Sequence, residues 1–152
     1  MSLLEELEGY ATVLPAVNEI EMHPKYQNTN TLNFCKTRGI AVIAYGNGIA
    51  LRDPDVVPGS KATGTNPSQI LLKWALHKGV SVIPKSTNVT RQMENLQAIN
   101  LTVSKEDLSR LDQLDTHAPF YWDMNVLGHD AGNDAGYGGR GPSLESQANY
   151  EL

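Results

Sequence analysis

The alternation of strand patterns with helical patterns is the feature that most constrains the fold. Three runs rich in apolar residues have the length and composition of strands: 16–22, 40–45 and 80–84. The helical patterns at 29–38 and 66–78 run into Gly39 and Gly79, where helices commonly end in a left-handed residue. A third helical pattern follows the last strand. This order predicts an α/β fold with a parallel sheet built from βα units.

Capping residues indicate where two of the helices begin. Asn66 can cap the helix at 66–78, Pro67 suits its first helical position, and Gln69 stands where a capping box has Glu or Gln. Ser104 can cap a last helix over 103–115. The strand at 40–45 is apolar on both faces, which predicts a strand covered on both sides.

Two segments lack these periodic patterns. Residues 52–67 contain three prolines and two glycines and are expected to form a loop. Residues 128–152 hold six glycines and few aliphatic side chains. We therefore expect residues 1–122 to form the α/β part and residues 123–152 to form a flexible, glycine-rich tail.

Composition narrows the classes of partner and compartment. The chain has 152 residues and a formal net charge of −5, which disfavours nonspecific binding to nucleic acid or an anionic membrane. Cys35 is the single cysteine, so no internal disulfide can form and a reducing, cytoplasmic setting is expected. No apolar run approaches the ~20 residues that span a bilayer, and the acidic start of the chain does not resemble a signal peptide.

The carboxyl end of the third predicted strand carries a cluster of polar side chains. In parallel α/β folds ligands bind at the carboxyl ends of strands. Lys85, Ser86, Thr87 and Asn88 follow this strand, and Arg91 lies one helical turn later. A helix N-terminus with two cations favours a phosphate. A well-capped helix with two solvated cations fits the same residues, and composition alone does not decide between these interpretations.

Other strand ends offer weaker candidates. Tyr45 could stack on a flat ring or could be an ordinary core tyrosine. Glu19, Glu21 and His23 follow or end the first strand, but the remaining histidines show no metal-ligand spacing relative to them, so no metal site is predicted. Cys35 lies on the apolar face of a helical pattern and is expected in the core.

Four motifs taken together resemble one enzyme family. The segments PAVNEIEMHP, GIAVIAYG, NPSQILLKWALHKGVSVIPKST and RQMEN are similar to the C-terminal part of the aldo-keto reductases, collinearly over about residues 14–115. These are TIM (β/α)8-barrel enzymes that reduce aldehydes and ketones with NADPH. The resemblance implies a partial barrel of three parallel strands alternating with helices, corresponding to the last three βα units.

The resemblance assigns a role to the cluster after the third strand. Lys85, Ser86 and Arg91 align with residues that hold the 2′-phosphate of NADPH. Thr87 and Asn88 lie in the same phosphate-binding turn. The family similarity therefore favours the phosphate interpretation and implies that the phosphate is the 2′-phosphate of NADPH.

The resemblance also implies contacts with the two rings of the cofactor. Glu94 and Asn95 match the pair beside the adenine, and Tyr45 matches the aromatic residue that stacks on the nicotinamide. Glu19 stands where the family usually has a glutamine that hydrogen-bonds the carboxamide. A carboxylate at this position can accept a hydrogen bond but cannot donate one.

The missing parts of the family pattern shape the functional hypothesis. A complete barrel needs about 250 residues and eight strands, and no segment here matches the family's catalytic tetrad. We expect a cofactor-binding portion of an NADPH-dependent aldo-keto reductase that is inactive alone and meets an aldehyde or ketone only when the missing half is supplied. The alternative is a noncatalytic truncated module that binds nucleotide weakly or serves in oligomeric interactions.

Three strands leave unpaired sheet edges, which predicts self-association.

Overall fold

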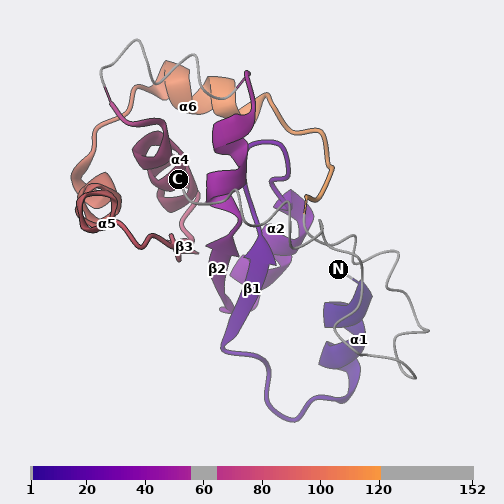
Figure 1. The fold of residues 1–152 in the computed structure, drawn as a ribbon. Helices are drawn as coiled ribbons and strands as arrows, with labels where there is room; N and C mark the ends of the chain where they lie inside the picture. The colour runs from indigo at the N-terminus through magenta and orange to yellow at the C-terminus, as the bar shows by residue number, and fades with distance from the viewer. Residues whose placement is uncertain (1, 56–64, 121–152) are drawn as a thin grey trace.

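The computed structural model describes residues 2–55 and 65–120 (Figure 1). Its elements in chain order are α1 (Ser2–Tyr10), β1 (Val17–Glu21), α2 (Thr29–Thr37), β2 (Ala41–Tyr45), the 3-10 segment η1 (Asn47–Arg52), α4 (Pro67–His77), β3 (Ser81–Val82), α5 (Val89–Gln97), the 3-10 segment η2 (Ala98–Asn100) and α6 (Lys105–Asp112). The predicted tail and most of the predicted loop lie outside the described residues.

The three strands form one parallel sheet in the order β1-β2-β3. Glu19 pairs with Ile43 and Glu21 pairs with Tyr45, while β3 pairs with β2 only through Ser81 and Val82. The predicted parallel α/β arrangement is confirmed. The third strand is shorter than the predicted 80–84.

The expectation that the second strand is covered on both faces is wrong. Val42 and Ala44 are buried, whereas Ala41 is exposed and Ile43 and Tyr45 are only half-buried. In Figure 1 the helices lie around a sheet that has no strands beyond β1 and β3 in the described part. Because three strands do not close into a barrel, the face that carries Tyr45 is only partly covered.

The predicted helix ends agree with the backbone in most respects. The side chain of Asn66 accepts a hydrogen bond from Ser68 N, and Pro67 occupies the first turn of α4. Gly39 and Gly79 have φ of 68° and 79°, the left-handed conformation expected after a helix. No helix in the described part is long and apolar enough to cross a membrane.

One predicted cap is wrong in its detail. Gln69 does not complete a capping box at the start of α4, because its side-chain amide donates to the Glu94 carbonyl at 2.8 Å instead. By contrast, Ser104 caps α6 as predicted, accepting from Asp107 N at 3.0 Å and donating to the Asp107 carboxylate at 2.7 Å. The Gln69 side chain thus joins α4 to α5.

The core lies between one face of the sheet and the helices α2, α4 and α6. Trp74 at the centre of α4 is fully buried, and its indole Nε1 donates to Asp112 Oδ1 at 2.7 Å. The Lys78 ammonium group lies 2.6 Å from the same carboxylate oxygen. Cys35 is fully buried and unbridged, as expected. This network ties α6 to α4.

Candidate functional site

A hydrogen-bonded turn connects the end of β3 to the first turn of α5. The Asn88 side chain accepts from Arg91 N at 3.1 Å, which caps the helix. Ser86 Oγ accepts from Asn88 N at 3.2 Å, and the Gln92 side chain donates to the Ser86 carbonyl at 2.8 Å. These contacts fix the position of the Ser86 hydroxyl next to the helix N-terminus.

The two cations of this turn have no anionic partner in the described part of the chain. Lys85 is exposed and Arg91 is half-buried, and neither forms an ion pair there. The Arg91 Nε atom is buried without a hydrogen-bond acceptor. A buried donor without an acceptor is costly, and the positive end of α5 adds to the same local charge. This donor set fits a phosphate group.

The residues predicted beside the adenine are placed differently from one another. Glu94 is half-buried, and its Oε2 atom accepts from Asn66 Nδ2 at 3.0 Å. Glu94 therefore anchors α5 to the start of α4. Asn95 is half-buried and Thr87 is exposed, and their side chains make no hydrogen bonds with other described residues. Asn95 and Thr87 are thus open to a ligand, whereas Glu94 is already used in the fold.

Glu19 and Tyr45 occupy a different part of the sheet, on its open face. Parallel pairing places Glu19, Glu21 and Tyr45 on the same face, with Glu21 and Tyr45 at the carboxyl ends of β1 and β2 and Glu19 in the middle of β1. Burial raises the pKa of the Tyr45 hydroxyl above its usual value, and the charges of Glu21 and Glu19 raise it further. A hydrogen bond with the Glu21 backbone opposes these effects. The two carboxylates thus act electrostatically on the Tyr45 hydroxyl.

A buried chain of contacts holds the carboxylate of Glu21. Glu21 is 3% exposed, and its Oε1 atom lies 2.9 Å from His23 Nε2 and accepts from Phe120 N at 2.6 Å. The His23 Nδ1 atom is buried and has no partner in the described residues. No group of three or more His, Cys, Asp or Glu side chains in those residues is arranged to hold a metal ion. Glu21 and His23 therefore serve the packing of the segment after α6 against β1.

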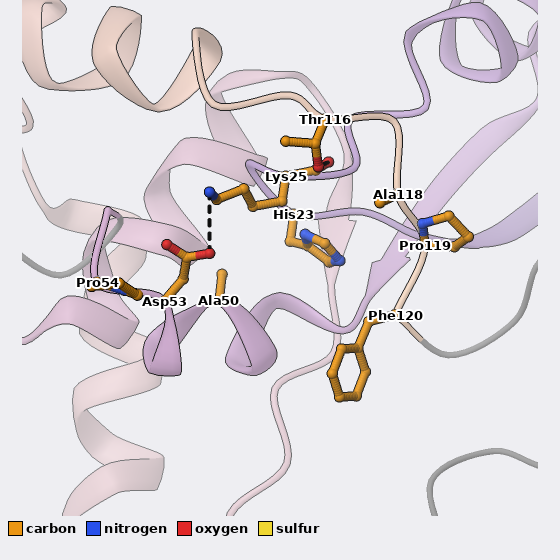
Figure 2. Close-up of a pocket in the computed structure, with 9 residues that line it drawn as sticks. All are labelled: His23, Lys25, Ala50, Asp53, Pro54, Thr116, Ala118, Pro119 and Phe120. Carbon is orange, nitrogen blue, oxygen red and sulfur yellow. Dashed lines mark hydrogen bonds and ion pairs between the residues drawn. The ribbon is translucent and has the colours of Figure 1, made fainter.

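A pocket of about 510 Å³ lies beside this chain of contacts (Figure 2). Its walls come from the segment after β1, from η1 with the residues that follow it, and from the segment after α6. The lining residues are His23, Lys25, Ala50, Asp53, Pro54, Thr116, Ala118, Pro119 and Phe120. Figure 2 shows the Lys25 side chain pointing towards Asp53, and His23 lies between Lys25 and Phe120. None of the nine predicted cofactor-binding residues lines it.

The charges of this pocket are balanced within the protein. The Lys25 ammonium group lies 2.8 Å from Asp55 and 3.2 Å from Asp53. The hydrogen bond with Asp55 raises the pKa of Lys25, with Asp53 contributing. Because two carboxylates offset one ammonium group, the pocket does not favour a phosphate. Sequence patterns did not predict it, because its lining residues are far apart along the chain.

Comparison with known proteins gives consistent matches. Residues 59–116 match the model of the Aldo/keto reductase family. The chain is 37% identical over 123 residues to D-galacturonate reductase of Fragaria ananassa, covering 74% of this chain and 39% of that protein. It is 33% identical over 146 residues to the NADPH-dependent D-xylose reductase of Meyerozyma guilliermondii, covering 83% of this chain and 46% of that protein.

A solved structure of the D53A mutant of Gox0644 in complex with NADPH matches this fold. It has a TM-score of 0.73 and 29% sequence identity, and the match covers 82% of this chain and 48% of that one. The chain therefore spans less than half the length of each of these proteins. The alignment lengths place most of its described residues within the similar region.

Proposed function

Because the chain belongs to the aldo-keto reductase family, we propose that it forms the C-terminal, cofactor-binding portion of an NADPH-dependent reductase. Its three parallel strands with their helices are an open part of the family's (β/α)8 barrel. When bound, the reduced nicotinamide of such a cofactor supplies a hydride to the carbonyl carbon of an aldehyde or ketone.

The observation that carries this proposal is the uncompensated positive charge at the start of α5. Lys85 and Arg91 have no carboxylate partner in the described part of the chain, and the buried Arg91 Nε lacks an acceptor. A 2′-phosphate would accept from Arg91 and neutralise both cations. Ser86, held against the Asn88 backbone, would donate to the same group. Thr87 and Asn88 belong to the same phosphate-binding turn, and Glu94 and Asn95 would lie beside the adenine.

At the opposite end of the cofactor, Tyr45 would support the nicotinamide ring and Glu19 would lie near its carboxamide. Tyr45 is half-buried and has an exposed carboxylate, Glu19, on the same face of the sheet. An aromatic ring at the carboxyl end of a barrel strand suits stacking on a flat ligand. This chain would orient the cofactor but contribute no catalytic acid, so we expect it to be inactive without the remaining barrel.

Titration of the full chain with NADPH, followed by nucleotide fluorescence, tests the proposal. We expect saturable binding that Arg91→Ala weakens by about 10- to 100-fold, the effect of removing one or two charge-assisted hydrogen bonds. Lys105→Ala removes an exposed lysine at the start of α6 and should leave the affinity unchanged. Absence of NADPH binding, or equal effects of the two substitutions, would contradict the proposal.

A second candidate function, interaction with another copy of the chain, is favoured by the apolar face of α5. Val89, Met93 and Leu96 are 73%, 53% and 60% exposed, and their spacing places them on one helical stripe. The sheet edge at β1 also exposes Val17. Unpaired edges and exposed apolar stripes favour association, so we propose self-association in a reducing, cytoplasmic setting, with noncatalytic nucleotide binding as the alternative role.

Light scattering coupled to size-exclusion chromatography tests this second role. We expect oligomers for the unmodified chain and a shift towards monomer for Met93→Glu combined with Leu96→Glu, since two new charges oppose burial of the stripe. Ser109→Glu combined with Gln113→Glu provides the control. Both positions are exposed; Ser109 lies in α6 and Gln113 just after it. A monomeric unmodified chain with native spectroscopic signals would contradict self-association.

A further inference from the structure

The open face of the sheet carries negative charge. Parallel register and strand alternation place seven residues on this face: Val17, Glu19, Glu21, Ala41, Ile43, Tyr45 and Ser81. Two of them are acidic and none is basic. The only aromatic side chain among them, Tyr45, lies directly opposite Glu21 in the strand pairing. A flat ligand placed against Tyr45 therefore meets negative charge from the neighbouring strand.

The two carboxylates differ in how they are held. Glu21 is buried and fixed by His23 and by the backbone N–H of Phe120, both at the pocket of Figure 2. Glu19 is exposed and forms no hydrogen bond or ion pair with any described residue. Its carboxylate is thus free to turn towards a ligand on Tyr45. Their joint influence on the Tyr45 hydroxyl indicates that both charges reach the ring's surroundings.

We propose that Glu19, with Glu21 behind it, makes this end of the site select a cationic ring over a neutral ring of the same shape. This inference rests on the proposed function, in which the ring is a nicotinamide. The oxidised nicotinamide is a pyridinium cation and the reduced form is uncharged, so the carboxylates stabilise bound NADP⁺ relative to bound NADPH. Glu19 is then a specificity-determining residue for the redox form of the cofactor.

The expected size of the selection follows from Coulomb's law near a protein surface. A single charge about 6 Å from the ring, in surroundings close to the dielectric of water, changes the relative affinity by roughly three- to tenfold. Glu19→Gln removes this charge and introduces an amide that can also donate a hydrogen bond. The new hydrogen bond acts on the carboxamide of both forms, so the ratio of affinities isolates the charge.

Calorimetric titration of the full chain with NADP⁺ and with NADPH tests the inference. We expect the unmodified chain to favour NADP⁺ and Glu19→Gln to reduce that preference by about three- to tenfold. Glu106→Gln makes the same chemical change at an exposed position of α6, and that residue is not among the charges acting on Tyr45. This control should leave the ratio unchanged, and raising the salt concentration should weaken the preference of the unmodified chain.

A second pair of ligands removes any dependence on the phosphate-binding end. The 1-methylnicotinamide cation and neutral nicotinamide differ in charge but share the ring and carboxamide. Chemical-shift titrations should give tighter binding of the cation to the unmodified chain, reduced by Glu19→Gln and insensitive to Arg91→Ala. If dinucleotides and both small rings bind but Glu19→Gln changes neither ratio, the inference is wrong and the proposed function stands. If no dinucleotide binds, the proposed function is wrong, and the ring pair still confirms or contradicts the charge selection.

Discussion

Helices α4 and α5 begin alike but are used in opposite ways. Each starts after an asparagine whose side chain accepts a backbone hydrogen bond, from Ser68 N in α4 and from Arg91 N in α5. Helix α4 buries Ile70, Leu71, Leu72, Trp74 and Ala75, whereas α5 has no buried residue. The same capping interaction therefore begins a core helix, α4, and a surface helix, α5.

The comparison separates substitutions that should unfold the protein from those that should only change binding. In α4 the apolar stripe is removed from water and its polar groups are paired, so truncation leaves cavities and unpaired atoms. In α5 the apolar stripe is exposed, Lys85 in the preceding turn is exposed, and Arg91 is only half-buried. The predictions below test whether this division holds, beginning with the largest expected effect.

Trp74→Ala should destabilise the protein by about 3–5 kcal/mol, the usual cost of removing a large buried aromatic side chain. The substitution leaves a cavity in the core and leaves Asp112 without its indole donor. Urea unfolding followed by circular dichroism measures the change. Met93→Ala, on the exposed stripe of α5, is the control and should cost less than about 0.5 kcal/mol. Similar costs at both positions would remove the distinction between the helices.

Removal of the two asparagine caps compares the contributions of α4 and α5 to stability. Asn66→Ala and Asn88→Ala each lose one cap hydrogen bond, which typically costs about 1 kcal/mol. Asn66 also donates to Glu94, so its substitution should be the more costly of the two. The same unfolding measurement reports both. A larger cost at Asn88 would mean that α5 contributes more to stability than its exposure indicates.

The ion pair between α1 and the end of α2 should give the smallest effect, visible as a pH dependence. Arg38 donates to both carboxylate oxygens of Glu8 at 2.7 Å. The hydrogen bond with Arg38 lowers the pKa of Glu8, so the stabilising contribution exists above the ordinary value of 4.5 and is lost as the pH falls through the lower, folded value. Because the pair is exposed, the loss should be slight.

Unfolding profiles of the unmodified chain and Glu8→Gln measure this contribution. The stability difference between the two should be present near neutral pH and should disappear as the pH falls below 4.5. A difference that grows on acidification would show that the sign of the coupling is wrong.

Local patterns predicted much of the fold, because its periodicity and capping are short-range. The parallel order of the strands, the caps Asn66 and Ser104, and the left-handed Gly39 and Gly79 all followed from neighbouring residues. The coverage of β2 did not, because it depends on what lies across the sheet. An apolar strand predicts burial, but whether the second face is covered depends on the strands, helices or loops that lie across it.

The candidate site also contains features that the local sequence indicates and features that arise only from contacts between distant segments. Lys85, Ser86, Asn88 and Arg91 are close in sequence, so one turn brings them together and the sequence could indicate it. The use of Gln69 and Glu94 in joining α4 to α5 depends on contacts between helices and was not foreseen. The pocket of Figure 2 escaped prediction for the same reason, since its walls meet only in the folded chain.

The central proposal is that the start of α5 holds a phosphate through Lys85 and Arg91, which have no anionic partner among the described residues. The most direct measurement is the ratio of NADPH to NADH affinity, obtained by titration for the unmodified chain and for Arg91→Ala. The two nucleotides differ only in the 2′-phosphate, so changes elsewhere in the site cancel in the ratio. The account predicts a preference for NADPH that falls by about 10- to 100-fold in Arg91→Ala. An unchanged ratio in a folded Arg91→Ala protein would contradict it.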